Sequence, residues 1–149
     1  YMLVNGDNVE GEDVLVPVLS RLGQADIVLP YGRATDRRPL NRKVVSRTYT
    51  ALVNLITGHK IHYYNGVVMH LRRNVMRWHS DTHGFGYQAT LVTRLLDEGA
   101  SYIEVEVPVI ERTQGVSKAF KFRNFMSIGH TLLEMFFRRL RRALFFSKH

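Results

Sequence analysis

The chain has 149 residues, 45% of them apolar, a composition that fits one globular domain or part of one. It has no cysteine, which excludes a disulfide framework and a thiolate metal site, and no apolar run is long enough to cross a bilayer. The net charge of +8 is uneven, because residues 1–119 carry 14 Lys/Arg against 12 Asp/Glu whereas residues 120–149 carry 7 against 1. This basic end favours a polyanionic partner, and without a DNA-binding motif a membrane surface is preferred to nucleic acid.

The apolar periodicity predicts a chain in which strands and helices alternate. Its first three elements are strand, helix and strand, which indicates a βαβ unit in an α/β fold. In chain order, the sequence predicts a strand from Met2 to Val4, a helix over 14–22, a strand over 25–29 ending at Pro30, a helix over 44–56, short extended pieces at 61–64 and 67–71 around the turn Asn65-Gly66, a short helix over 74–79, a helix over 87–96, a half-buried or edge strand over 101–109, and a long amphipathic helix over 122–146.

The first strand ends in the acidic, Gly-bearing turn Asn5-Gly6-Asp7-Asn8. This turn would set the carboxylate of Asp7 at the carboxyl end of a strand, where open α/β sheets bind ligands. Carboxylate oxygens suit Mg²⁺ or Mn²⁺. A surface turn explains Asp7 equally well. For Glu12 and Asp13 the preferred interpretation is the first turn of a helix, where the helix dipole favours acids.

Two polar segments carry cations and hydroxyls next to predicted strand ends. Backbone N–H groups at helix starts and forked arginine donors suit phosphate, whereas a solvated basic loop is the plainer interpretation. The segment His79-Ser80-Asp81-Thr82-His83 offers a weaker metal site, since loop histidines are seldom ligands. The phosphate candidates are Arg33, Arg42, Ser46 and Arg47 in the first segment, and Arg112, Ser117 and Lys118 in the second.

The predicted C-terminal helix has a broad apolar face and a basic cluster near its end. A basic amphipathic helix of this kind often lies in the membrane interface. The alternative is a helix that packs on the core or on a partner subunit. The apolar face comprises Phe125, Ile128, Leu132, Leu133, Phe136, Phe137, Leu140, Leu144 and Phe145, and the cluster comprises Arg138, Arg139, Arg141 and Arg142.

Together these motifs resemble family 2 glycosyltransferases, especially the polyprenyl- or dolichyl-phosphate sugar transferases. "MLVNGDN" is similar to the end of the strand that bears the family's Asp-x-Asp metal motif, with Asn5 in place of the first Asp, and "ADIVLPYGR" to the strand that follows. "NRKVVSR" resembles the family's Arg-x-x-x-Ser helix start, and "YYNGVVMHLRR" its Ser-Gly-Phe-Arg segment. The most specific stretch is "HGFGYQATLVTRLLDEGASYIEVEVPVIERTQGVSK", which resembles the Gly-Phe-Gln helix, the Glu-Val-Pro strand and the Arg-x-x-Gly-x-Ser-Lys loop.

This resemblance implies a GT-A fold truncated at its N-terminus, with residues 1–119 as the C-terminal half of the catalytic domain and residues 120–149 as a basic amphipathic helical tail. It implies that Asp7 is the catalytic carboxylate that holds Mg²⁺ or Mn²⁺ on the sugar-nucleotide diphosphate. The implied phosphate- or acceptor-binding residues are Arg33, Arg42, Ser46, Arg112, Ser117 and Lys118. The implied substrate-pocket residues are Asn5, Asn8, Asn65, Gly66 and Gln88.

The function that follows is transfer of a sugar from a nucleotide-sugar donor to a lipid-phosphate or lipid-linked acceptor. The enzyme would be peripheral, at the cytoplasmic face of a membrane, and would reach that surface through residues 120–149. One alternative is transfer to a hydroxyl of a glycan or another acceptor, which would need a general base. The other is a non-enzymatic membrane-binding module in which the tail is the working part.

Overall fold

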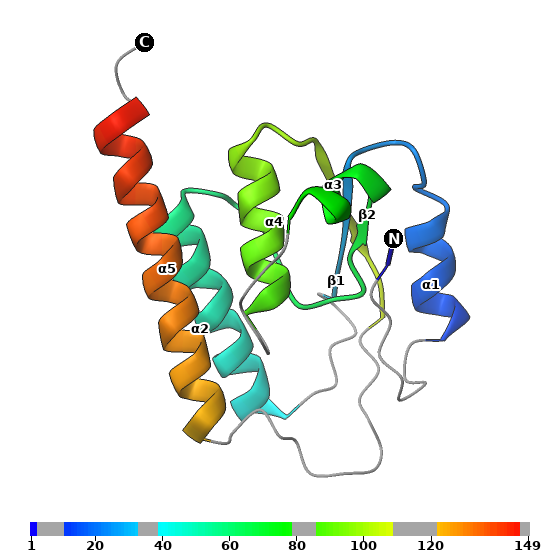
Figure 1. The fold of residues 1–149 in the computed structure, drawn as a ribbon. Helices are drawn as coiled ribbons and strands as arrows, with labels where there is room; N and C mark the ends of the chain where they lie inside the picture. Colours follow the sequence, from blue (N-terminus) through cyan, green and yellow to red (C-terminus); the bar gives the residue numbers. More distant parts are fainter. Residues whose placement is uncertain (3–10, 33–38, 79–85, 109–121, 147–149) are drawn as a thin grey trace.

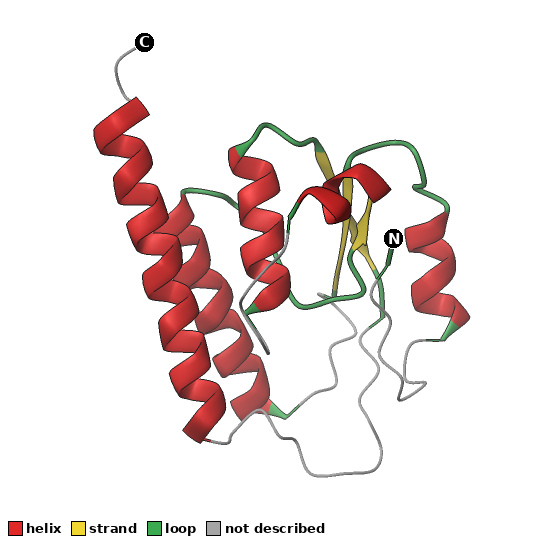
Figure 2. Cartoon of the chain, in the orientation of Figure 1, coloured by secondary structure: helices red, strands yellow, loops and turns green. Residues whose placement is uncertain are grey.

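The computed structural model describes residues 1–2, 11–32, 39–78, 86–108 and 122–146, and Figure 1 shows their course. These residues form a mixed α/β structure with a small three-stranded sheet and five helices, which Figure 2 distinguishes by colour. In chain order the elements are α1 (Glu12–Leu19), β1 (Ile27–Tyr31), α2 (Leu40–Thr57), β2 (Met69–His70), α3 (Arg72–Arg77), α4 (Tyr87–Asp97), β3 (Tyr102–Glu106) and α5 (Phe122–Phe146).

β1 is the central strand of the sheet, whose order is β2–β1–β3. It pairs in parallel with β3 along its whole length from Ile27 to Tyr31, and it is antiparallel to β2. Met2 forms an isolated antiparallel bridge to Met69 of β2. Met2 is antiparallel to β2, and β2 is antiparallel to β1, so the chain at Met2 runs parallel to β1. Of the predicted strand from Met2 to Val4, only Met2 is described, and its direction is the one that a strand–helix–strand order requires. β2 lies between Met2 and β1.

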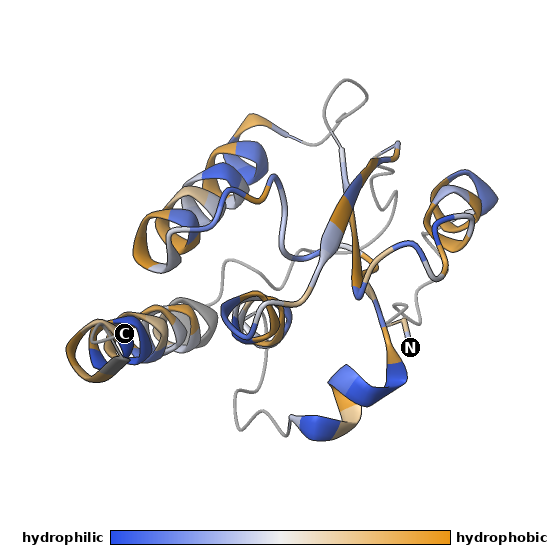
Figure 3. Cartoon of the chain, turned by 90° about the horizontal axis from the view of Figure 1, so that it is seen from above, coloured by the Kyte–Doolittle hydropathy of each residue, from blue (hydrophilic) through white to orange (hydrophobic). Residues whose placement is uncertain are grey.

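Apolar layers cover both faces of β1, because successive side chains of a strand point to opposite faces. Ile27 and Leu29 face a core shared with α2, α4 and α5, whereas Val28 faces α1. Figure 3 shows α1 on one side of the sheet, α2 and α4 on the other, and α5 outside them. The core on the first side comprises Ile27, Leu29, Tyr49, Val53, Ile61, Tyr64, Val68, Ala89, Leu91, Val92, Leu95 and Met135.

The prediction of an extended piece at 61–64 is wrong: these residues form no strand, although Ile61 and Tyr64 are buried. The side chain of Asn54 on α2 donates to the Ile61 carbonyl at 2.8 Å and accepts from the Ile61 N–H at 3.2 Å. It also accepts from the Tyr64 hydroxyl at 2.7 Å. These bonds satisfy the backbone polar groups that a neighbouring strand would otherwise satisfy. Only Met69 and His70 of the second predicted piece, 67–71, are in a strand.

The bounds of α1 and β1 differ from the predicted ranges 14–22 and 25–29. α1 ends at Leu19 instead of residue 22, because the bonds of the following residues span three residues instead of four: the Arg21 N–H donates to the Val18 carbonyl at 3.2 Å and the Leu22 N–H to the Leu19 carbonyl at 3.0 Å. β1 continues past Pro30, where Tyr31 keeps the pairing by accepting from the Val107 N–H at 2.9 Å.

The strongly periodic segments are confirmed. α5 has the predicted bounds, α4 differs from its prediction by one residue, and β3 is an edge strand. α2 covers Leu40–Thr57 and so begins earlier than the predicted range 44–56. Gly58 caps its end with a φ of 79°, the left-handed conformation that glycine adopts without strain. α3 covers Arg72–Arg77, two residues earlier than predicted.

Candidate functional site

The two parallel strands β1 and β3 end on the same side of the sheet. β1 and β3 run in one direction, so their carboxyl ends share one edge, which we call the carboxyl edge. The isolated bridge at Met2 has the same direction as these two strands. Figure 1 shows α1, α2, α4 and α5 beginning on this side. Carboxyl ends of parallel strands and the N–H groups of helix starts are where α/β folds bind anionic ligands. The carboxyl edge is therefore the candidate site.

Most of the predicted site residues follow these strand ends directly in the sequence. Segment 3–10 follows Met2, segment 33–38 begins two residues after β1, and segment 109–121 begins three residues after β3. All three segments lie outside the described residues. They carry Asn5, Asp7 and Asn8 in the first, Arg33 in the second, and Arg112, Ser117 and Lys118 in the third.

Four predicted residues are described at or near the carboxyl edge. Arg42 and Ser46 are half-buried in the first two turns of α2, which begins on this side. Asn65 and Gly66 lie beside the end of β1. A Cβ atom at Gly66 would be 2.9 Å from Pro30 Cγ and 3.0 Å from the Pro30 carbonyl oxygen, so only glycine fits this approach without a shift. The structure thus brings the predicted turn dipeptide to β1.

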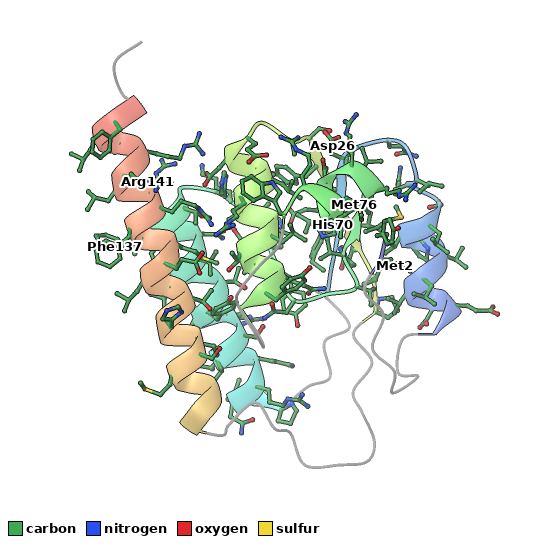
Figure 4. The ribbon with its side chains drawn as sticks, in the orientation of Figure 1. Met2, Asp26, His70, Met76, Phe137 and Arg141 are labelled. Carbon is green, nitrogen blue, oxygen red and sulfur yellow. The ribbon has the colours of Figure 1, made fainter. Side chains whose placement is uncertain are left out.

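Gln88 occupies the first turn of α4 and lines a cavity of about 150 Å³. Met2 and His70 line the same cavity, and Figure 4 shows these two side chains near each other. Burial lowers the pKa of His70 to about 4, so the imidazole is neutral at pH 7. The cavity therefore places an amide and a neutral imidazole next to the chain that leads to Asp7.

A second polar centre, none of whose residues is among the predicted site residues, lies between α4 and α5. Asp97 in the last turn of α4 has a side chain only 9% exposed and contacts one histidine and two arginines. His59 Nε2 lies 3.2 Å from Asp97 Oδ1, Arg142 Nη1 also lies 3.2 Å from Oδ1, and Arg138 Nε lies 3.4 Å from Oδ2. Burial alone would raise the pKa of Asp97, but the bond with His59 and the charges of Arg138 and Arg142 outweigh it and lower the pKa below its ordinary value.

This centre corrects the interpretation of the basic cluster at the end of α5. Arg138 and Arg142 turn inward to Asp97, and Arg139 lies against Gly58 at the end of α2. A sequence signal for the inward pair existed, because Glu134, Arg138 and Arg142 recur every four residues and therefore share one face of the helix.

The apolar face of α5 is also divided. Ile128 and Leu132 pack against the core, which confirms packing on the core for that part of the helix. A second apolar stripe, on the side opposite this contact, remains exposed, and Figure 4 shows Phe137 directed away from α4. Within the described residues, no helix has both the length and the apolar character to cross a membrane. The outer stripe of α5 comprises Met126, Leu133, Phe136, Phe137, Leu140 and Leu144.

No group of three or more His, Asp or Glu side chains that could hold a metal ion occurs in the part of the chain that the structure describes. Asp7 and the segment with His79, Asp81 and His83 lie outside it. A further acid, Asp26, is described: it accepts from the Ser101 hydroxyl and N–H and from Arg73, which lower its pKa. Asp26 precedes β1 and therefore lies at the edge opposite the candidate site, where it joins the starts of β1 and β3.

No protein-family model, curated protein or solved structure matches this chain. The fold itself defines a mixed α/β protein whose two parallel strands, β1 and β3, end at one edge.

Proposed function

We propose that the protein is a glycosyltransferase of the GT-A class that transfers a sugar from a nucleotide sugar to a lipid-phosphate or lipid-linked acceptor. One observation carries the proposal: the segments with Arg33 and Arg112 follow the ends of β1 and β3 at the carboxyl edge, and the segment with Asp7 follows Met2, whose bridge to the same sheet has the parallel direction. Residues far apart in the sequence can meet there. The mixed sheet with helices on both faces is compatible with a GT-A domain.

The chemistry requires stabilisation of the negative charge that builds on the departing nucleoside diphosphate. A divalent cation and arginine or lysine donors directed at the diphosphate would lower this barrier. Mg²⁺ at such sites needs only one or two protein carboxylates, because substrate phosphates and water complete its octahedron. One carboxylate, Asp7, therefore suffices in the proposal, with Arg33, Arg42, Arg112 and Lys118 as the cations.

The outer stripe of α5 supports a membrane-associated acceptor. Its exposed Phe, Leu and Met side chains form a contiguous apolar stripe, which on a protein surface commonly marks an interaction site. Arg141, which is exposed beside the stripe, would face anionic headgroups when the stripe enters the interface. A lipid-linked acceptor would be presented at the same surface.

The decisive experiment replaces Asp7 in the full-length protein. We expect Asp7→Asn and Asp7→Ala to abolish Mg²⁺- or Mn²⁺-dependent sugar transfer to a polyprenyl phosphate, whereas Asp13→Ala, which removes an exposed acid in the first turn of α1, leaves transfer unchanged. Unchanged turnover in both Asp7 variants would refute the role of Asp7. A parallel assay with a sugar hydroxyl as acceptor separates the two enzymatic alternatives.

The α5 stripe also favours the non-enzymatic alternative, a peripheral membrane module. That function predicts vesicle binding without any transfer activity, and binding that Asp7→Ala does not alter. Transfer activity that depends on Asp7 would exclude it as the sole function.

A further inference from the structure

The groove between α4 and α5 is lined by four arginines and three acids. Its volume is about 670 Å³, and Trp78 and Phe137 provide its aromatic lining. The groove residues on α4 belong to its second half, whereas the helix begins at the carboxyl edge, so the groove is separate from the candidate site. The charged lining residues are Arg94, Asp97, Glu98, Glu134, Arg138, Arg141 and Arg142.

Each acid in the groove already has a partner. Asp97 is shared by His59, Arg138 and Arg142, as described above. Glu134 Oε1 accepts from Arg94 Nη2 at 2.7 Å. Glu98 Oε2 accepts from the Trp78 indole at 3.3 Å and lies 3.6 Å from Arg77 Nη2. The acids therefore leave little capacity for additional cations.

Several arginine donors, in contrast, remain without a partner. Arg138 Nη1 and Arg94 Nε are buried and have no hydrogen-bond partner among the described residues. The Arg138 side chain is only 15% exposed, so bulk water does not supply a hydrogen-bond acceptor to its Nη1 atom. Arg141 lines the same groove and is exposed. Arg141 therefore offers exposed donors to a space whose wall also contains Arg94 and Arg138, each with one buried donor that lacks a partner among the described residues.

We propose that this α4–α5 groove binds a phosphate monoester. Guanidinium donors pair most strongly with phosphate and carboxylate oxygens. A phosphate monoester has three terminal oxygens and close to two negative charges at pH 7, so it can accept from several arginines at once, whereas a carboxylate offers two oxygens and one charge. The Trp78 ring, which already lies 5.3 Å from the Arg94 guanidinium carbon, would contact the organic part of the ester.

Two kinds of molecule carry a phosphate monoester that this groove could bind: a soluble phosphate ester and the headgroup of phosphatidic acid. Phe137 links the groove to the outer stripe of α5, since it belongs to both. A headgroup could therefore enter the groove while its acyl chains contact the stripe. The experiment distinguishes these sources by presenting the phosphate free or in a vesicle.

The test compares Arg141→Gln with Arg139→Gln in the full chain. Both variants remove one charge from an exposed position of α5, but Arg139 lies against Gly58 and does not line the groove. Binding is measured by calorimetry with inorganic phosphate and glycerol phosphate, and by sedimentation with vesicles of phosphatidylcholine containing phosphatidic acid. Vesicles containing phosphatidylserine at equal charge measure general attraction to anionic lipid.

We expect Arg141→Gln to weaken binding of the phosphate probe by roughly tenfold, the loss that follows removal of one charge-assisted hydrogen bond, and Arg139→Gln to leave it nearly unchanged. Binding of free glycerol phosphate, weakened in Arg141→Gln, would identify a soluble phosphate ester as the ligand. Preference for phosphatidic acid over phosphatidylserine, lost in Arg141→Gln alone, assigns the headgroup. Equal losses in both variants, or no binding of any probe by the wild-type protein, overturn the proposal.

Discussion

Gly86 at the start of α4 lies directly against Thr131 of α5, so that a Cβ atom at position 86 would overlap the Thr131 side chain and lie 2.6 Å from its Cγ2 atom. Thr131 is fully buried in this contact. The missing side chain of Gly86 thus lets two helices that are far apart in the sequence approach closely. The contact also fixes the helix turn that carries Gln88.

Replacement of Gly86 tests this close approach. We expect Gly86→Ala to lower the free energy of unfolding by about 1–3 kcal/mol, because overpacking forces the two helices apart. Gly129→Ala is the matched control: a Cβ atom there meets nothing within 4 Å, and it lies inside α5. Alanine should stabilise that helix by up to about 1 kcal/mol. Denaturant unfolding measures both variants, and similar changes in the two would contradict the described packing.

Asn54 is expected to hold the loop from residue 58 to 64 on α2. Asn54→Ala removes both bonds to the Ile61 backbone and the bond to the Tyr64 hydroxyl, which leaves buried polar groups without partners. A loss of about 2 kcal/mol in unfolding free energy follows, together with faster amide exchange at Ile61. Leu55→Ala, at a position 81% exposed, serves as control and should change little. Unchanged exchange in Asn54→Ala would show that other contacts hold the loop.

Gly86 and Asn54 make contacts that the sequence alone could not reveal. Helices α4 and α5 were predictable because their apolar residues recur with a helical period and glycines follow or precede them. Local pattern also suggested strands around residues 61–71, since buried apolar residues there resemble strand residues. The partner that prevents strand pairing at Ile61 is the side chain of Asn54, and no periodicity encodes such a bond.

The candidate site was predictable in part. The apolar runs over 25–29 and 101–109 indicated strands, and the structure brings the ends of β1 and β3 to one edge. The predicted strand end before Asp7 lies outside the described residues. Asp97 was not identified because its partners Arg138 and Arg142 lie more than forty residues later in the chain. Their meeting depends on how α5 packs against α4, which only the tertiary structure defines. The same packing explains why α5 has two apolar sides, one for the core and one exposed.

Asp97 should stabilise the protein in a pH-dependent manner. Its folded-state pKa lies below the ordinary value of 3.8, so its contribution is present above pH 3.8 and is lost as the pH falls through the lower, folded-state value. We expect Asp97→Asn to cost about 2 kcal/mol at pH 7, because it leaves Arg138 without its buried counter-charge. The difference from wild type should shrink in acid.

Urea unfolding at pH 7 and at pH 3 measures this dependence. Glu98→Gln is the matched control, since the neighbouring carboxylate is 35% exposed and its ion pair with Arg77 spans 3.6 Å. Exposed pairs contribute less than about 1 kcal/mol, so this variant should be nearly neutral. A deficit in Asp97→Asn that stays the same at both pH values would argue against an electrostatic role for Asp97.

The outer stripe of α5 should govern attachment to anionic vesicles. Phe137 is 61% exposed there, and full transfer of a Phe side chain from water into an apolar phase is favourable by roughly 1.5–3 kcal/mol. Phe137→Glu forfeits this gain and adds repulsion from the lipid headgroups, so we expect vesicle affinity to fall by at least about tenfold, measured by sedimentation. Leu55→Glu introduces the same charge at an exposed position of α2 and should cause only a small loss. If both variants bind as the wild type does, α5 does not contact the membrane through this stripe; if both lose affinity equally, charge alone accounts for the binding.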